Sequence, residues 1–187
     1  PGRVWYEQGS EDRGITDRFI VLAVPISVAT RLLGMAPESA VTTAPWRVAQ
    51  IHVHRLPASR GVGTAWDSVL RESTSLGYVT STHQEDKSRH GATLTWYEPL
   101  TGDPSIARRS LADTTWQSEA GRVLDDLAHA HADLREVTTS VDVWHWGHGT
   151  VRPVPGLHRV GRLEAMRPHR EGIAVAHTDL SGMSLFE

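Results

Sequence analysis

The residues best placed for chemistry lie near the C-terminal end, where a polar turn follows a short apolar strand. The apolar run covers residues 173–176, and Asp179 precedes Ser181 and Gly182. This order is typical of nucleotide cofactor sites, because backbone N–H groups at a helix start can hold an anion. Ligands also bind beyond the carboxyl ends of strands in open α/β sheets. By spacing alone, an ordinary Asp or Ser cap of a helix beginning near Ser181 fits better than a cofactor site.

Eleven histidines indicate metal binding as a second kind of chemistry. His52 and His54 share one face of an alternating segment, and a His-x-His pair on a strand can bind zinc or iron. Such a pair needs a third ligand, which the sequence does not locate. Histidines are more often ordinary polar residues of an amphipathic sheet. A metal-binding protein centred on His52 and His54 therefore stands as one alternative.

Aromatic side chains offer a third possibility, because they could stack on a flat ligand. They are Trp46, Trp66, Tyr78, Trp96 and Tyr97. Such residues more often form the core and cross-strand pairs. A non-enzymatic binding module, with Trp66, Tyr78 and Trp96 pointing into an aromatic-lined groove of the sheet, is the second alternative. Serine-hydrolase chemistry is not indicated, since no G-x-S-x-G occurs.

The composition narrows the class of protein. The 187 residues suffice to bury a core, and 39% hydrophobic with 22% charged residues is typical of a folded, soluble chain. A net charge of −3 argues against a nucleic-acid-binding surface. No apolar stretch approaches the ~18 residues of a membrane span. Without cysteine, disulfides, thiolate metal sites and a cysteine-linked cofactor are excluded, and the reducing cytoplasm is the default compartment.

The N-terminal elements fit a parallel sheet. Residues 4–6 predict a short strand that pairs across the 8–16 turn region. The continuous apolar run at 19–24 predicts a strand buried on both faces. Residues 26–33 have helical spacing and end at Gly34, a plausible helix stop.

The centre of the chain has a different pattern. Alternating segments at 46–56, 65–70, 76–83 and 92–97, separated by turns, predict an antiparallel meander of about four strands. Asp103 and Pro104 predict a helix N-cap and first helical position. Helical patterning continues with breaks to about residue 136, and β patterning returns at 137–146.

A buried strand near each end therefore flanks an antiparallel sheet with helices. The predicted fold class is α+β or α/β, with two structural units interleaved in the sequence. Both chain ends also look cut, since residues 181–187 read as a helix that stops in its first turn. We expect a fragment of something longer.

Several stretches together resemble one family. Residues 176–187 (AHTDLSGMSLFE) resemble the C-terminal FAD-binding segment of the flavin-containing amine oxidoreductases, which include protoporphyrinogen-oxidase-like members. The stretches WDSVL at 66–70, LGYVTSTHQ at 76–84 and WGHGTVRP at 146–153 resemble a bacterial NAD(P)/FAD-binding branch of the same family. Residues 20–25 (IVLAVP) match the family's strand that ends before a helix. The motifs occur in the family's order over nearly the whole chain.

The resemblance implies a domain plan. Residues 1–35 would be a partial FAD-binding segment, 36–145 a substrate domain with an antiparallel sheet and then helices, and 146–187 a truncated return segment to the Rossmann-like FAD-binding domain. The family's Gly-rich fingerprint has no counterpart here, because Gly61-Val62-Gly63 precedes a strand and lacks the third glycine. The chain thus resembles the C-terminal portion only, and it would need the missing N-terminal FAD-binding region or chain as a partner.

The resemblance also implies site residues. Asp179 would contact the ribityl or pyrophosphate region of FAD, and Gly182 and Met183 would offer backbone N–H groups. Trp146 and His148 are candidates for lining the flavin cavity, although Trp146 is also expected as a core indole. No catalytic residue is assigned beyond these two.

One departure from the family bears on the reaction. Many amine-oxidising members use a lysine near the flavin, but the only lysine here, Lys87, lies in a polar turn. Oxidation of a simple amine is therefore in doubt. The expected activity is hydride abstraction from a small organic substrate, next to nitrogen, or a desaturation, with FAD bound non-covalently. We expect the isolated chain to be inactive.

Overall fold

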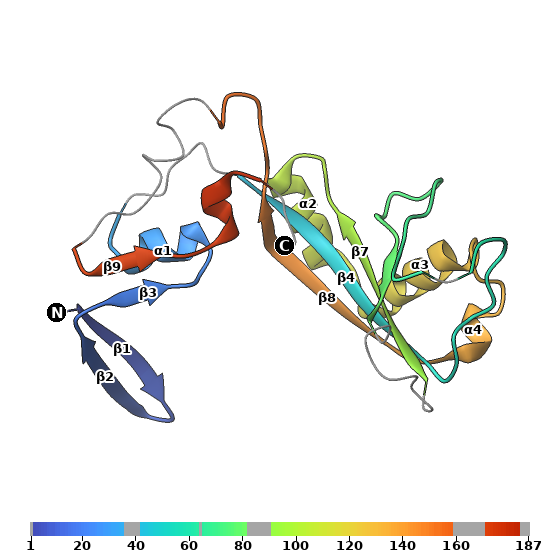
Figure 1. The fold of residues 1–187 in the computed structure, drawn as a ribbon, viewed down its shortest axis with the longest axis horizontal. Coiled ribbons are helices and arrows are strands. Elements are labelled where there is room, and N and C mark those ends of the chain that lie inside the picture. Colours follow the sequence, from blue (N-terminus) through green and yellow to red (C-terminus); the bar gives the residue numbers. More distant parts are fainter. Residues whose placement is uncertain (1, 36–41, 64, 82–90, 159–170, 184–187) are drawn as a thin grey trace. The chain divides into compact units, whose positions relative to one another are not determined.

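The computed structural model describes residues 2–35, 42–63, 65–81, 91–158 and 171–183. The chain divides into two compact units (Figure 1). Unit 1 combines the two ends of the chain, Pro1–Thr43 and Thr150–Glu187, and unit 2 is the continuous segment Ala44–Gly149. The two ends of the sequence thus fold together, and the centre folds by itself.

A five-stranded sheet forms unit 2, in the order β5-β6-β7-β4-β8. The strands are β4 (Thr43–Val53), β5 (Asp67–Ser68), β6 (Tyr78–Thr80), β7 (Ala92–Pro99) and β8 (Thr138–Val151). β4 pairs antiparallel with β7 from Trp46 opposite Pro99 to Val53 opposite Ala92. The predicted antiparallel sheet is confirmed, but only β5, β6 and β7 follow one another as a meander, because β4 pairs with β7 rather than with β5. β8 runs further than the expected 137–146.

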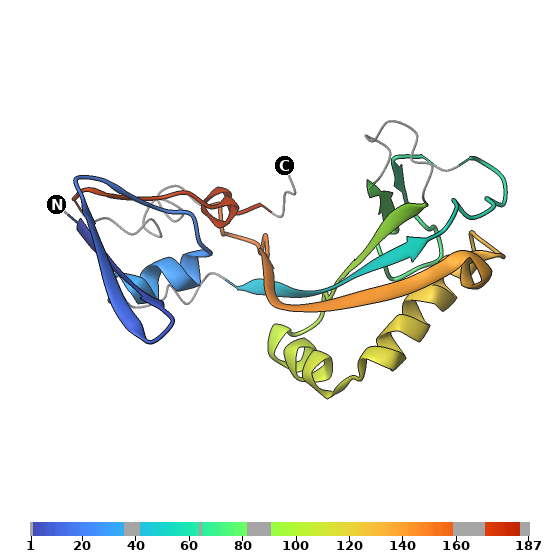
Figure 2. The same ribbon diagram turned by 90° about the horizontal axis from the view of Figure 1, so that it is seen from below.

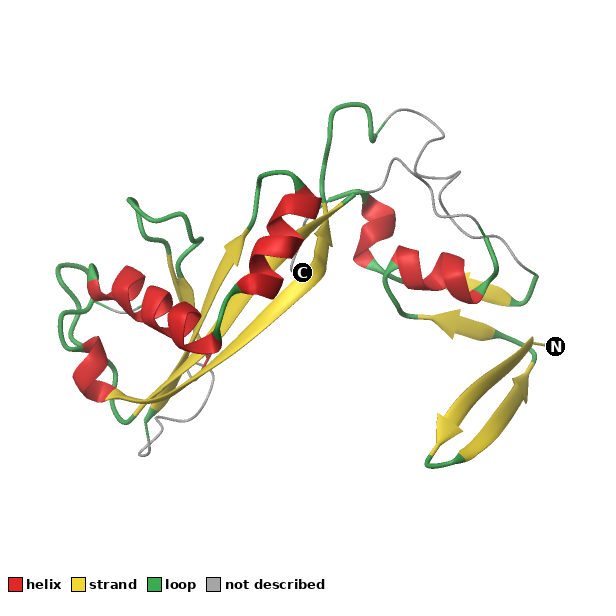
Figure 3. Ribbon diagram, turned by 180° about the vertical axis from the view of Figure 1, so that it is seen from behind, coloured by secondary structure: helices red, strands yellow, loops and turns green. Residues whose placement is uncertain are grey.

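Three helices lie over one face of this sheet (Figures 2 and 3). They are α2 (Pro104–Asp113), α3 (Trp116–Ala128) and α4 (Leu134–Val137). α2 begins as the sequence predicts, because the Asp103 side chain accepts hydrogen bonds from the N–H groups of Ser105 and Ile106. The breaks predicted in the helical region fall at residues 114–115 and 129–133.

The core of unit 2 fills the space between the sheet and the helices. Burial alternates along β4 and β7, so that every second side chain faces the helices. The buried set includes Ile51, Leu94 and Trp96 on the strands and Val123 and Leu127 on α3. The intervening side chains are only half buried. They form what we call the half-buried face, consisting of Val48, Gln50, His52, Thr93, Thr95 and Tyr97.

Unit 1 contains two small pairs of strands. β1 (Gly2–Gln8) and β2 (Glu11–Asp17) form an antiparallel hairpin, which the sequence predicted only around residues 4–6. β3 (Ile20–Leu22) pairs in parallel with β9 (Ile173–Val175), joining segments from opposite ends of the chain. The parallel pair agrees with an α/β arrangement.

The expectation that residues 19–24 are buried on both faces is wrong for this chain. Val21 is 64% exposed and Phe19 is 73% exposed. The apolar pattern is one that parallel strands show when helices cover both faces. In the described part of the chain, β3 has only β9 beside it in the sheet. The apolar side chains of residues 19 and 21 therefore remain exposed.

A helix follows β3, and a short turn of 3-10 helix follows β9. α1 (Ile26–Leu32) ends, as predicted, where Gly34 adopts a left-handed φ of 67°. η2 (Thr178–Ser181) is followed by Gly182, also left-handed at φ 68°. A small apolar cluster of Ile26, Val151 and Leu157 packs with Val154 and Leu180. Both chain ends contribute to this cluster.

Candidate functional site

The turn after β9 is held by Asp179, a residue that is 2% exposed. Its Oδ2 accepts a hydrogen bond from the backbone N–H of Ile26 at 3.0 Å. Ile26 is the first residue of α1, so Asp179 satisfies a helix-start donor from 153 residues away in the sequence. The sequence predicted a cap at Asp179, but on the helix that follows it rather than on α1.

His177 completes this arrangement. Its Nδ1 accepts a hydrogen bond from the backbone N–H of Asp179 at 3.2 Å and lies 3.2 Å from Asp179 Oδ2. His158, from an earlier segment, also contacts this turn, with its Nε2 3.1 Å from the carbonyl oxygen of Gly182. The side chains of His158 and His177 therefore hold the backbone of residues 177–182, and Asp179 links this turn to the start of α1.

The expected helix start at Ser181 and Gly182 is wrong. Gly182 ends the 3-10 turn, and its N–H donates to the carbonyl of Asp179 at 3.1 Å. The N–H of Met183 donates to Ser181 Oγ at 3.2 Å. Residues 184–187, the remainder of the expected helix, lie outside the described residues. In the structure both N–H groups have internal acceptors.

The second region of interest is the end of β8 and the strand beside it. The indole of Trp46 stacks on Tyr97 with ring centroids 6.4 Å apart, across the pair β4 and β7. Tyr97 donates its hydroxyl to Asp67 Oδ1 at 3.2 Å. Burial, followed by the Asp67 charge, raises the pKa of the Tyr97 phenol. These side chains form an aromatic and acidic group on the half-buried face.

Two glycines of β8 fit against other elements of unit 2. A Cβ on Gly149 would stand 2.4 Å from Trp46 Cδ1, so only glycine lets the indole lie that close to β8. At Gly147 the carbonyl oxygen accepts a hydrogen bond from Arg108 Nη1 of α2 at 3.1 Å. His148, which the resemblance picks out, lies between these two contacts.

The side chains of His148 and Trp146 are exposed in the structure. Trp146 is 54% exposed, so it is not the core indole that the sequence allowed. The His148 pKa is lowered from its usual value by partial burial and, secondly, by the Arg108 charge. No sequence pattern points to Arg108, because α2 reaches β8 only in the folded chain.

The two histidines considered as metal ligands, His52 and His54, have other surroundings in the structure. His52 Nε2 lies 3.1 Å from Asp142 Oδ2, and Thr93 Oγ1 lies 3.2 Å from His52 Nδ1. Within the described residues, no group of three or more His, Asp or Glu side chains is placed to hold a metal ion. His54 lies just beyond β4, exposed to solvent. The structure therefore gives the metal alternative no support.

Two of the three residues proposed to line an aromatic groove are buried in the core instead. Tyr78 is 2% exposed and Trp96 is 1% exposed, and both face the helices. Tyr78 hydrogen-bonds His131 Nε2 at 2.7 Å, and Trp96 Nε1 donates to Asp126 Oδ2 at 2.7 Å. Asp126 thus anchors α3 to β7. Only Trp66, 50% exposed, keeps an open position.

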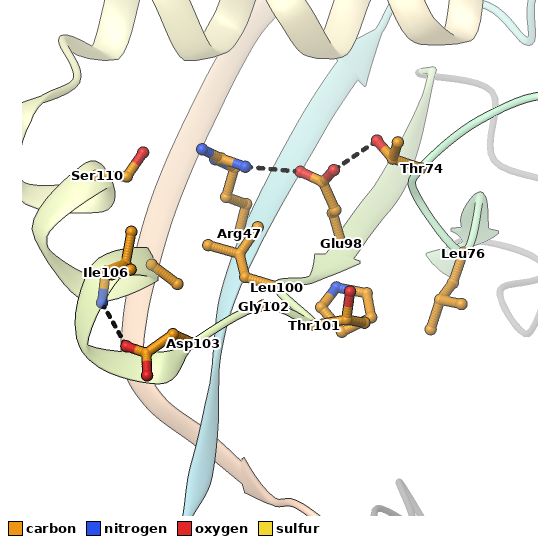
Figure 4. Close-up of a pocket in the computed structure, with 12 residues that line it drawn as sticks. Arg47, Thr74, Leu76, Glu98, Leu100, Thr101, Gly102, Asp103, Ile106 and Ser110 are labelled. Atoms are coloured by element: carbon orange, nitrogen blue, oxygen red, sulfur yellow. Dashed lines mark hydrogen bonds and ion pairs between the residues drawn. The ribbon is translucent and has the colours of Figure 1, made fainter.

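A pocket of about 610 Å³ opens on the helix side of the sheet, next to the start of α2 (Figure 4). Buried Arg47 and Glu98 lie in its wall, with Nη1 and Oε2 2.9 Å apart. Arg47 Nε is also 3.0 Å from Glu119 Oε2, although not at a hydrogen-bonding angle. Arg122 and Thr74 both donate hydrogen bonds to Glu98 Oε1. These charges neutralise one another and link β4, β7 and α3.

No protein-family model and no curated protein matches the sequence. The fold, however, is similar to that of the cyclohexylamine oxidase from Brevibacterium oxydans IH-35A. The similarity covers 95% of this chain with a TM-score of 0.60 and 17% sequence identity. The chain therefore has an amine-oxidase-like fold. It spans 40% of the length of that oxidase.

The likeness to that oxidase bears on the fold class predicted from the sequence. The α+β class with an antiparallel sheet, helices and interleaved terminal segments is confirmed. The described helices include none that is both long and apolar enough to cross a membrane. The stretch 82–90, which holds Lys87, lies outside the described residues, so its predicted turn stays a prediction.

Proposed function

We propose that this chain is the C-terminal portion of a FAD-dependent oxidoreductase of the flavin-containing amine oxidoreductase family, located in the cytoplasm. One observation carries the proposal: 95% of the chain has the fold of a cyclohexylamine oxidase. The sequence motifs point to the same family independently of the fold. In this proposal unit 2 is the substrate domain and unit 1 belongs to the FAD-binding domain.

The turn after β9 is the proposed cofactor contact. It follows the carboxyl end of a parallel strand, which is where ligands bind in α/β sheets. The residues fit FAD only in part, because the buried Asp179 carboxylate already accepts the Ile26 N–H and the N–H groups of Gly182 and Met183 have acceptors within the turn. Asp179 therefore shapes the turn in this proposal, while the residues around Gly182 and Met183 approach the cofactor. FAD would supply hydride acceptance when bound.

Unit 2 would bind a small organic substrate and orient it. The side chains proposed for this are Trp146 and His148 of β8, with the stacked pair of Trp46 and Tyr97 nearby on the sheet. The reaction class is removal of a hydride from a carbon next to nitrogen, or a desaturation. Aromatic walls hold such a substrate and exclude water.

Flavin binding tests the proposal. The chain would be co-expressed with a polypeptide that carries a strand followed by G-x-G-x-x-G, and the purified complex scanned for flavin absorbance near neutral pH. We expect a yellow complex, and a colourless chain when it is expressed alone. A stable complex without flavin would contradict the proposal.

A matched pair of variants makes the test specific to the turn. Gly182 has a left-handed φ, so Gly182→Val should distort the turn and weaken flavin retention. Gly9→Val changes a left-handed glycine of the β1–β2 hairpin with nothing within 4 Å. Flavin retention should remain unchanged in this control, and equal losses in both variants would contradict the assignment.

A further inference from the structure

The sheet of unit 2 has one short edge and one long edge. β5 forms one edge with 2 residues, whereas β8 forms the other with 14 residues. In Figure 1 β8 runs along the side of β4 that faces away from β7. In the described part of the chain β8 has a neighbouring strand on one side only. A row of its backbone N–H and C=O groups therefore faces outward without a partner strand.

This edge lacks the features that normally keep edge strands from pairing. Proteins protect such edges with lysine, proline, a short strand or a covering segment. Residues 138–151 contain no lysine, arginine or proline, and Asp142 is their only acidic residue. Arg108 donates to the Gly147 carbonyl at 3.1 Å, but a carbonyl oxygen has a second lone pair and can accept another N–H. The composition of β8 therefore favours pairing with another extended strand.

The side chains of β8 alternate between the two faces of the sheet. Val141 and Val143 pack against the core, so the odd-numbered positions face the helices. Asp142 lies 3.1 Å from His52 of the half-buried face, so the even-numbered positions share that face. The exposed residues of the even-numbered set are Asp142, Trp144, Trp146 and His148. A partner strand at this edge would therefore meet two indoles, 40% and 54% exposed.

A second copy of β8 complements this edge when the two strands run antiparallel about a two-fold axis at His145. An axis perpendicular to the sheet keeps the helices of both copies on one face. Position 144 of each copy then meets position 146 of the other, which forms two cross-strand tryptophan pairs. On the helix side, Val143 and Val141 meet Gly147 and Gly149, so a branched side chain lies opposite a residue without one. The strand is thus self-complementary on both faces.

The carboxylate of Asp142 favours this register over its neighbours. Each Asp142 meets His148 of the other copy, and no other register about such an axis places it opposite a histidine. His52 approaches Oδ2 of this carboxylate, and within the described residues Oδ1 has no partner. A neutral imidazole can donate a ring N–H to a carboxylate, so the lowered pKa of His148 does not prevent the contact. The contact adds to the interaction that His148 has in its own chain.

We propose that β8 is an interaction edge at which two copies of this chain pair as antiparallel strands about His145 and join their sheets. The same edge is used on both copies, so the assembly closes at two chains. A single strand pair buries less area than a permanent interface, so the dimer is weak and depends on concentration. The interaction goes beyond the proposed function and needs no flavin.

The absence of cysteine allows a direct test of the register. His145→Cys would place two thiols opposite each other at the axis, where Cα atoms about 4.5–5.5 Å apart suit a disulfide. Ser140→Cys is the control, because it is exposed on the same strand but the two thiols would lie roughly 30 Å apart. Under mild oxidation the disulfide-linked dimer of His145→Cys should form about 10-fold faster or more.

Analytical ultracentrifugation tests the pairing without a cross-link. All samples carry Phe19→Ser and Val21→Thr, which removes the exposed apolar side chains beside and on β3 from the comparison. We expect a reversible equilibrium between monomer and dimer. His145→Lys places two like charges opposite each other at the axis and should weaken the dimer about 10-fold or more. Ser140→Lys adds the same charge away from the axis and should leave the equilibrium unchanged.

The outcomes separate this edge from other modes of association. Far-ultraviolet circular dichroism shows whether each variant keeps the fold of the unmodified chain. Equal cross-linking rates in the two cysteine variants, or equal weakening by the two lysine variants, would overturn the proposal. A chain that stays monomeric over the whole concentration range would overturn it as well. None of these results depends on flavin, so they leave the test of the proposed function unaffected.

Discussion

At the scale of single residues, the partner decides what each polar side chain does. Asp125 and Asp126 are neighbours on α3, yet Asp125 pairs with Arg135 at the surface while Asp126 accepts hydrogen bonds from Trp96 and Ser75. The identical side chains differ because one faces solvent and the other faces the sheet. Their adjacent positions in the sequence do not reveal this difference.

The Tyr97 phenol should lose its proton at higher pH than an ordinary tyrosine. Burial and the negative charge of Asp67 both disfavour the phenolate and raise its pKa. Asp67→Asn should lower the midpoint without restoring the usual value of 10.0, because burial remains. Ultraviolet titration of the chain, with Tyr97→Phe identifying the Tyr97 transition, measures both. A midpoint unaffected by Asp67→Asn would contradict the Asp67 contact.

The buried pair of Tyr78 and His131 should contribute to stability. His131 Nδ1 lies 3.1 Å from the Ala58 carbonyl, which only accepts, so Nδ1 donates and Nε2 accepts from Tyr78. Tyr78→Phe leaves that nitrogen buried without a donor and should cost about 1–3 kcal/mol of unfolding free energy.

The control for Tyr78→Phe is Tyr97→Phe, which removes a hydroxyl bonded to exposed Asp67. Its cost should stay below about 1.5 kcal/mol, because water replaces the lost partner. Denaturant unfolding compares the two variants. Equal costs would show that the buried pair has no special importance.

At the scale of elements, the local pattern sets where strands and helices form, and contacts between elements set how they end. Asp103 caps its own helix α2, and this is visible in the sequence. α1 has no side-chain cap from its own N-cap residue, Pro25, and takes its acceptor from the distant Asp179 instead. This cap links the turn after β9 to the start of α1, although the two segments are far apart in the sequence.

Removal of the Asp179 carboxylate should loosen α1. Asp179→Ala leaves the buried Ile26 N–H without an acceptor, so amide hydrogen exchange of Ile26 should become about 10-fold faster or more, equivalent to roughly 1.5–3 kcal/mol. Asp17→Ala is the control, since Asp17 accepts the Arg18 N–H at 2.6 Å at an exposed position. Unchanged exchange at Ile26 in Asp179→Ala would show that the contact does not hold α1.

At the scale of the whole molecule, apolar side chains remain exposed on the strands of unit 1. Phe19 and Val21 are each more than 60% exposed on or next to β3. Such side chains are normally covered by neighbouring helices in parallel sheets. The described residues provide only β9 beside β3, so these apolar side chains stay in contact with water.

The chain alone should therefore self-associate through this strand. The double variant of Phe19→Ser and Val21→Thr should lower light scattering at high protein concentration, because it removes exposed apolar area. Val62→Thr is the control, as Val62 is 91% exposed in a loop of unit 2. Equal scattering by the double variant and the control would indicate another surface.

The sequence by itself determined the local elements and the class of fold. Alternation gave the antiparallel strands, Asp103 with Pro104 gave the start of α2, and Gly34 gave the end of α1, because each depends on neighbours in the chain. The composition also limits the chemistry directly, since a chain without cysteine cannot form a thiol link to a cofactor and a chain with one lysine has a single candidate for a lysine role.

Only the tertiary structure decided what the candidate site residues touch. It assigned Asp179 to α1, exposed Trp146, buried Tyr78 and Trp96, and placed Arg108 against Gly147 beside His148. Each of these outcomes depends on a contact between residues far apart in the sequence. Periodicity predicts which side of an element is apolar, but it does not say which other element meets that side.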